Sequence, residues 1–301
     1  MNARTVSMGA PFGWLMKAID VGRRNPRALF GGFALVMLVG LVPSVVQLGL
    51  QVALAGSPQL MMALYLLVLL ASLVLMPPLT GGALRLLHAC ETGQPAAATD
   101  VLAGYADRPF AVRMILTALL MMLVYLVVFG VLYAVMPGKE FMAELFARSV
   151  ATPPGGQPDM SNLPDFPPSF LLWLLGAGAV LMVLAHAYLL AFSHAALGGH
   201  GAVEAVGQGF KATLKNVLPL LGFTLAMCVV GFVAMLVLAL VIGLLAGALM
   251  LVSPVLAGVV LLPVYLGVML VLYVVMFGFY YHGWREIFGA PAADPMEAIA
   301  A

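Results

Sequence analysis

Charged side chains are scarce in this chain of 301 residues, where Asp, Glu, Lys and Arg together make up 8%. A soluble domain has roughly a quarter of its residues charged, whereas hydrophobic residues here reach 64%. The composition therefore excludes an ordinary soluble domain and predicts that the lipid bilayer is the solvent. The net charge is only +1, and the basic residues are scattered between apolar stretches. Phosphate recognition needs a concentrated basic surface, so a nucleic-acid partner is excluded as well.

Cysteines and enzyme signatures are rare or missing. Cys90 lies near a polar stretch and Cys228 inside an apolar one, so we expect no disulfide between them. There is no P-loop, no G-x-S-x-G and no H-E-x-x-H motif, and the glycine-rich pieces do not follow a strand as a nucleotide site requires. The sequence therefore predicts no catalytic, cofactor-binding or metal-binding residue, and hence no enzyme.

Acidic residues, lysine and arginine are absent from the middle of the apolar stretches. No Asp, Glu, Lys or Arg occurs between Lys215 and Arg285. Proton-coupled carriers and intramembrane enzymes depend on such groups inside the bilayer. Both classes are therefore disfavoured, whereas a pathway for lipids or other amphiphiles tolerates an apolar lining.

Long apolar stretches dominate what is present, and about 20 helical residues cross a hydrocarbon core of roughly 30 Å. The last stretch, 217–282, is too long for one crossing and must turn back, most readily at Ser253-Pro254. No signal peptide is evident, so we expect the first stretch to remain in the protein. The sequence predicts an all-α, polytopic membrane protein with one membrane domain, 1–301, and six spans at about 28–50, 60–84, 114–136, 169–197, 217–243 and 258–282.

The distribution of basic residues between the loops predicts the orientation of the chain. Only Lys139 and Arg148 fall on the side opposite the termini, and the other Lys and Arg fall on the side that holds both termini. This places both termini in the cytoplasm, with the spans in a bacterial inner membrane. The residues predicted to anchor the topology or to contact lipid headgroups are Arg23, Arg24, Arg27, Arg85, Arg108, Arg113, Lys211, Lys215 and Arg285.

Short amphipathic segments lead into alternate spans, which indicates three hairpins. In 203–215, apolar residues recur at helical spacing opposite Glu, Gln and Lys, and 12–19 has a similar pattern. Both should lie in the headgroup plane. The stretch "KNVLPLLGF" also echoes "RNPRALFGGF", as expected of a repeated unit.

The loop 138–168 is expected on the periplasmic side and has two parts. In its first part, Glu140, Glu144 and Arg148 recur every four residues opposite apolar side chains, which predicts a short surface-lying helix. Its second part is rich in proline, which favours extended chain over a packed subdomain.

A few polar residues within the spans are candidates for a site. His186 and His194 are eight residues apart and share a helix face. A proton or metal site is conceivable there, but a neutral histidine hydrogen-bonded to a neighbouring helix is the favoured interpretation. Ser44, Gln47 and Gln51 could line a polar vestibule, although contact with headgroups and neighbouring helices is favoured for them too.

Two further patterns are interpreted without a metal. His88, His194 and His282 fall where spans two, four and six reach the cytoplasmic interface, but they lack carboxylate or thiolate partners at ligand spacing. Interfacial histidines with a hydrated tip are the favoured interpretation. The 20 methionines form no regular ladder within one span and are best read as flexible apolar packing.

Four stretches carry a resemblance to known proteins: "GWLMKAIDVGRRNPRALFGGF", "PPLTGGALRLLHACETGQP", "GFKATLKNVLPLLGF" and "YYHGWREIFG". Together they resemble a family of uncharacterised six-span bacterial inner-membrane proteins. That family is similar in layout to the membrane domain associated with glycerophosphoryl diester phosphodiesterases. The resemblance implies six spans in the inner membrane, but it transfers no catalytic or binding residue, and no soluble phosphodiesterase domain is attached here.

Three classes of function remain after these exclusions. The expected one is a non-enzymatic envelope protein that assembles with, or regulates, other membrane components. The alternative is a transporter, channel or lipid-moving protein without proton-coupling carboxylates, and an intramembrane enzyme is the weakest of the three. The expected partners are membrane lipids, together with a membrane-protein partner or a second copy of the chain, and no cofactor is expected.

Overall fold

The computed structural model describes residues 3–53, 57–151 and 167–289. Within these ranges the chain forms ten α-helices and one short 3-10 helix, and no strand. Six of the helices are long and apolar enough to cross a membrane. The prediction of an all-α chain with six membrane-spanning helices is confirmed, and its architecture is that of a multi-pass membrane protein.

Five of the six spanning helices are longer than the apolar stretches that predict them, and α7 has the predicted bounds. In particular, α3 continues past residue 84 to Thr92 and so includes polar residues such as Arg85 and His88. Pro77 and Pro78 lie inside α3 and do not end it. The turn in the last stretch falls at Ser253, whose side chain accepts a hydrogen bond from the amide of Leu256. The spans are α2 (Pro26–Ala53), α3 (Pro58–Thr92), α5 (Arg108–Ala134), α7 (Ser169–Leu197), α9 (Val217–Val252) and α10 (Pro254–Phe288).

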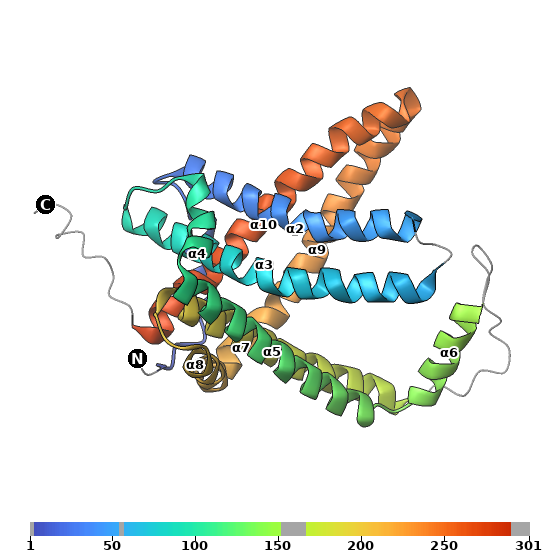
Figure 1. The fold of residues 1–301 in the computed structure, drawn as a ribbon, viewed down its shortest axis with the longest axis horizontal. Helices are drawn as coiled ribbons and strands as arrows, with labels where there is room; N and C mark the ends of the chain where they lie inside the picture. Colours follow the sequence, from blue (N-terminus) through green and yellow to red (C-terminus); the bar gives the residue numbers. More distant parts are fainter. Residues whose placement is uncertain (1–2, 54–56, 152–166, 290–301) are drawn as a thin grey trace, which may run out of the picture.

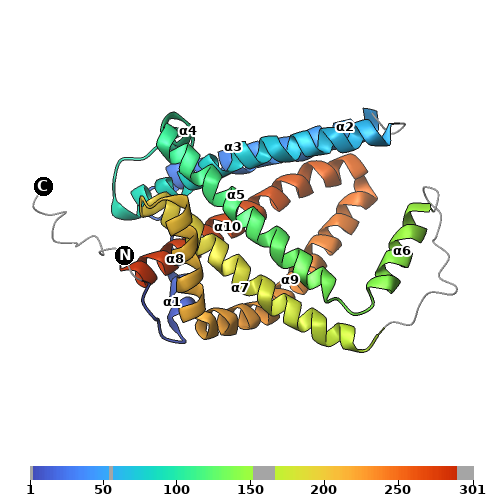
Figure 2. The same ribbon diagram turned by 60° about the horizontal axis from the view of Figure 1, so that its bottom comes forward.

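Successive spans pair as three hairpins, formed by α2 with α3, α5 with α7, and α9 with α10 (Figure 1). We call the end of the bundle that holds α1 (Ala10–Ile19) and the last turn of α10 the terminal end, and the opposite one the far end. The predicted surface helix exists as α6 (Lys139–Ala151), which stands apart from the bundle at the far end (Figure 2). The Pro-rich part of that loop lies largely outside the described residues.

A short helix at the terminal end precedes the first span of each hairpin. These are α1, the 3-10 helix η1 (Ala98–Leu102) followed by α4 (Ala103–Ala106), and α8 (Ala202–Lys215). The helix η1 packs on α3, α8 packs on α7, and α1 packs on α10. Each short element therefore contacts the second span of the preceding hairpin, and α1 closes the ring by contacting the last one.

Glycines permit the close approach at each of these three contacts. A methyl group at Gly82 of α3 would collide with the carbonyl of Val101 in η1. At Gly209 of α8 it would lie 2.6 Å from the carbonyl oxygen of Ala187, and at Gly278 of α10 it would lie 3.0 Å from the Cβ of Ala18. The same type of contact recurs in all three units, which supports the repeated unit predicted from the sequence.

The first span of each hairpin begins at an Asn or Asp. The side chain of Asn25 accepts from the amide of Ala28 at 3.2 Å, and that of Asp107 accepts from the amide of Phe110 at 3.1 Å. These residues cap α2 and α5, because a helix start leaves its first amides without partners. Asn216, before α9, instead bonds to the N-terminal segment: it accepts from the amide of Val6 at 2.8 Å and donates to the carbonyl of Arg4 at 2.9 Å.

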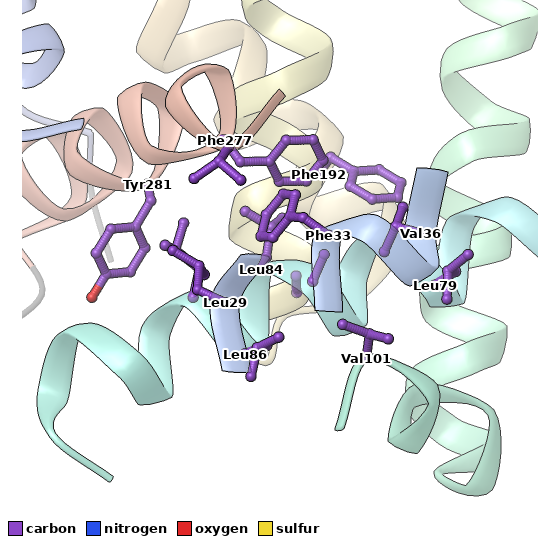
Figure 3. Packing of buried hydrophobic residues seen from close by; sticks show 14 of the residues in the cluster. Leu29, Phe33, Val36, Leu79, Leu84, Leu86, Val101, Phe192, Phe277 and Tyr281 are labelled. Atoms are coloured by element: carbon purple, nitrogen blue, oxygen red, sulfur yellow. The ribbon is translucent and has the colours of Figure 1, made fainter. Parts of the chain in front are cut away.

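The hydrophobic core lies at the terminal end (Figure 3). There Phe33 of α2, Leu79 and Leu86 of α3, Phe192 of α7 and Phe277 of α10 are buried together. Toward the far end the hairpins diverge (Figures 1 and 2), and their apolar side chains are exposed. In a bilayer these outer halves face lipid. The helices are therefore held together by packing at the terminal end and are separated from one another at the far end.

Candidate functional site

A pocket of about 340 Å³ lies where α7, α9 and α10 begin to diverge. Leu15 of α1 contributes to its wall. Apolar side chains form most of the lining, and its polar groups come from His186, Thr224 and Tyr280. The lining residues that matter for its chemistry are Met182, Ala185, His186, Thr224, Met227 and Tyr280.

A chain of hydrogen bonds joins the three helices at this pocket. The Nε2 atom of His186 lies 2.8 Å from the Oγ1 atom of Thr224, and its Nδ1 atom lies 3.0 Å from the hydroxyl of Tyr280. Thr224 donates its single hydroxyl proton to the carbonyl of Leu220 at 2.9 Å. Thr224 therefore accepts from His186, which carries a proton on Nε2. Because a charged imidazole is costly inside the bilayer, Nδ1 carries no proton and accepts from Tyr280. The imidazole is neutral and bonded on both sides.

This arrangement suits binding better than chemistry. No Asp, Glu, Lys or Arg lines the pocket, and the donors of His186, Thr224 and Tyr280 all have acceptors within the protein. The described residues contain no group of three or more His, Cys, Asp and Glu side chains that could hold a metal ion. The pocket is an apolar cavity with a few polar groups, and small-molecule binding sites typically have this composition.

The two histidines singled out from the sequence do not form one site. His194 is buried at the terminal end, with its ring stacked on those of His200 at 4.5 Å and Phe288 at 4.2 Å. Its Nδ1 atom accepts from the indole N–H of Trp284 at 3.2 Å. His186 alone belongs to the pocket, and His194 belongs to the packing between α7 and α10.

The histidines at the ends of the even spans also have separate surroundings. His88 on α3 lies 3.0 Å from the hydroxyl of Tyr281, whereas His194 contacts Trp284. His282 follows Tyr281 on α10, and its Nε2 atom is buried without a hydrogen-bond partner. The three imidazoles therefore do not converge on a common point among the described residues.

The polar residues of α2 lie away from the pocket. Ser44, Gln47 and Gln51 are exposed on the far half of the helix. An apolar groove of about 320 Å³ lies nearby between α2 and α3, and Pro43 and Ser72 are among its lining residues. In a bilayer, the three polar side chains face lipid or headgroups.

Several of the predicted anchors make contacts within the protein at the terminal end. Arg85 lies over the ring of Phe110, 3.5 Å from its centroid, and bonds to the carboxylate of Asp107 at 3.1 Å. The Phe110 amide and then Arg85 hold the pKa of the Asp107 carboxyl below its usual range. Arg113 donates to the carbonyl of Ala195 at 2.9 Å. These arginines join α3, α5 and α7.

The other predicted anchors lie around the same end. Arg23 pairs with Asp20 at 2.8 Å, Arg24 donates to the carbonyl of Glu91 at 2.8 Å, and Lys215 donates to the carbonyl of Ala3 at 2.9 Å. Arg285 lies over the ring of Tyr281, 5.7 Å from its centroid. The remaining three predicted anchors, Arg27, Arg108 and Lys211, are exposed to the surroundings of the protein.

Sequence reasoning missed Thr224 and Tyr280. Both lie in long apolar spans, and nothing in their spacing relates them to His186, which is on another helix. The signal that was available is the cost of a polar group in the bilayer, since each must find a partner. That rule identifies His186 as a candidate but does not name its partners.

Comparison with known proteins adds no further constraint on this site. No family model matches the chain, and neither a curated protein nor a solved structure matches it. The resemblance to six-span inner-membrane proteins therefore stays a prediction, and the function is inferred from the geometry of the pocket.

Proposed function

We propose that this chain is a non-enzymatic membrane protein that takes up an amphiphile from the bilayer and holds or moves it through the pocket between α7, α9 and α10. The observation that carries the proposal is the pocket of about 340 Å³, which is apolar apart from the edge formed by His186, Thr224 and Tyr280. Its lining has neither the charged groups of an ion path nor the acid–base pairs of an enzyme. An acyl chain is the kind of ligand that it accommodates.

Two further features support uptake from the lipid. The hairpins diverge beyond the pocket (Figure 2), and the spans expose apolar side chains there, such as Leu240 of α9 and Val259 of α10. In a bilayer these side chains contact acyl chains beside the pocket. Met182, Met227 and Met276 line the pocket, and methionine side chains adapt to ligands of irregular shape. Both features favour a site that admits a flexible chain.

We further propose that the terminal end faces the cytoplasm and that the membrane is a bacterial inner membrane. The support is the accumulation of Arg and Lys at the terminal end, because positively charged loops stay on the cytoplasmic side. In this orientation, the pocket lies in the half of the bilayer nearer the cytoplasm, and α6 lies on the periplasmic side.

The test is transbilayer movement of two fluorescent lipid analogues, one with a neutral head group and one with a phosphate head group, in liposomes that contain the purified protein. Ala185→Phe should fill the pocket and reduce the protein-dependent rate several-fold, because Ala185 lines the pocket. Ala179→Phe is the matched control, since Ala179 is exposed on the same helix and faces lipid. Equal rates for the two variants and the wild type, or no movement above empty liposomes, would argue against the proposal.

An assembly or regulatory role in the envelope is the second candidate, and one observation favours it. The helix α6 stands off from the bundle, and its Phe146 side chain is 70% exposed. Such a face could contact a membrane partner on the periplasmic side. Co-purification of one stoichiometric partner, lost when residues 138–168 are deleted, would support this role, and retention of the partner after the deletion would oppose it.

A further inference from the structure

The Tyr280 oxygen is a polar atom of the pocket that keeps an unused bonding position and takes part in one bond only, whereas the Oγ1 atom of Thr224 is already bonded to both His186 and Leu220. The hydroxyl proton is donated to His186, but a phenol oxygen can also accept a hydrogen bond. Among the described residues, no N–H or O–H group donates to it. Tyr280 lines both the main pocket and a narrower cavity of about 30 Å³ between α3, α7 and α10, so its free lone pair is available to a molecule in the pocket.

The direction of the hydrogen-bond chain decides which ligand group this oxygen can meet. The proton of Tyr280 goes to His186, that of His186 to Thr224, and that of Thr224 to the carbonyl of Leu220. All three donors are therefore used inside the protein, and the chain ends in the pocket on an acceptor. A ligand carbonyl can only accept a hydrogen bond. It would gain one from Tyr280 only if all three hydrogen bonds changed direction, and Thr224 would then no longer donate to the carbonyl of Leu220.

The absence of charged residues from the lining favours a ligand with an uncharged head group. No Lys or Arg lines the pocket, so a phosphate or carboxylate placed beside Tyr280 would be desolvated without a counter-ion, which is strongly unfavourable. A neutral head that carries a hydrogen-bond donor meets no such penalty. The volume of about 340 Å³ is near the lower end of small-molecule pockets, which span about 300–1,000 Å³, and accommodates one chain more readily than a whole phospholipid.

We propose that the pocket selects a neutral long-chain amphiphile whose hydroxyl or amide N–H donates to the oxygen of Tyr280. This inference rests on the proposed function, because it names the ligand class of the same pocket. Tyr280 is the specificity-determining residue, and His186 positions it: the bond to Nδ1 occupies the phenol proton, so that the oxygen is left to accept.

The experiment uses the full chain in phosphatidylcholine nanodiscs and three photoreactive probes. These are a 16-carbon alcohol with a diazirine near the chain end, its methyl ether and its phosphate monoester. The labelled fraction of intact protein is measured by mass spectrometry, and the labelled peptides are mapped to α7, α9 and α10. The alcohol should label these helices about two- to tenfold more than the ether, as expected for one net hydrogen bond, and the phosphate should label them least.

Two variants assign the difference to one atom. Tyr280→Phe should still be labelled but should bring the ratio of alcohol to ether close to one. Tyr273→Phe makes the same substitution on the same helix, where the ring packs on Phe33 outside the main pocket, and it should keep the wild-type ratio. If Tyr280→Phe does not fold, the comparison of the three probes on the wild-type protein still decides the question.

The outcomes separate this inference from the proposed function. Equal labelling by alcohol and ether, or strongest labelling by the phosphate, overturns the ligand class. If that labelling is nevertheless lost in Ala185→Phe and kept in Ala179→Phe, the pocket still binds an amphiphile. If none of the probes labels residues of the pocket above the lipid-facing background, the proposed function falls together with the ligand class.

Discussion

At the scale of single residues, the structure places its polar side chains where they join segments distant in the sequence. His186 links α7 to both α9 and α10, and Asn216 links the start of α9 to the N-terminal segment. A buried polar group in a membrane protein is stable only when it is bonded, because lipid offers no replacement. These few residues therefore fix how apolar helices of similar appearance are arranged.

Asn216 provides the residue-scale prediction. Its side chain is 0% exposed and bonds to Val6, Arg4 and Ala212. In Asn216→Ala the amide of Val6 and the carbonyl of Arg4 lose these partners. The free energy of unfolding in detergent should therefore fall by about 1–3 kcal/mol. Residues 3–9 should also become sensitive to protease.

The control for this experiment is Lys211→Ala, which removes an exposed side chain from the neighbouring helix α8. It should leave both the unfolding midpoint and the protease pattern unchanged. An Asn216→Ala protein as stable and as resistant as Lys211→Ala would show that these bonds do not hold the N-terminal segment in place.

At the scale of elements, the recurring unit is a short helix followed by a hairpin of two spans. Each short helix crosses the second span of the preceding unit at a glycine, as with Gly209 of α8 against α7. The closeness of these contacts leaves no room for a side chain. The three contacts tie the hairpins together at the terminal end, so that the outer halves are free to diverge.

Gly209→Ala should break one of these contacts. The new methyl group would lie 2.6 Å from the carbonyl oxygen of Ala187 and 2.7 Å from the amide of Ala191, and these backbone atoms can move only with the helix. Overpacking of this kind costs about 1–3 kcal/mol, so the midpoint of thermal unfolding in detergent should fall.

Gly207→Ala is the matched control on the same helix. A methyl group at Gly207 meets no atom within 4 Å, and alanine favours a helix over glycine by up to about 1 kcal/mol. The midpoint of this variant should stay the same or rise. If both variants fall equally, then loss of glycine rather than crowding against α7 explains the effect.

The sequence allowed the elements to be predicted better than the site. Apolar stretches locate the six spans, and Ser253-Pro254 locates the last turn, because both signals are local. The extension of α3 to Thr92 escaped prediction, since polar residues such as Arg85 end an apolar stretch without ending a helix. The pocket escaped it as well: His186, Thr224 and Tyr280 lie on three helices, and only tertiary packing relates them.

At the scale of the whole molecule, one end is packed and basic and the other is open and apolar. Side chains such as Phe33 and Phe277 are buried at the terminal end, whereas the far half of α9 exposes residues such as Leu240 and Leu251. The terminal end is therefore held together by packing, whereas apolar grooves between the spans, such as the one between α2 and α3, face the surrounding lipid. The proposed uptake of an amphiphile uses this difference, because the pocket lies at the boundary between the two halves.

The proposed orientation predicts the effect of reversing charge at the first span. Replacing Arg23, Arg24 and Arg27 together with glutamate removes the basic cluster at the start of α2 and should weaken insertion or invert the first hairpin. Reporter fusions after α2 and after α3 measure the side on which each loop lies. An unchanged topology would contradict the assignment of the terminal end to the cytoplasm.

The most direct test of the central claim is an experimental map of the protein in lipid nanodiscs, with an antibody fragment bound to aid alignment. We expect an elongated density, not belonging to the protein, between α7, α9 and α10, with one end within hydrogen-bonding distance of the Tyr280 oxygen. A map in which these helices close against one another and leave no space beside His186 would contradict it.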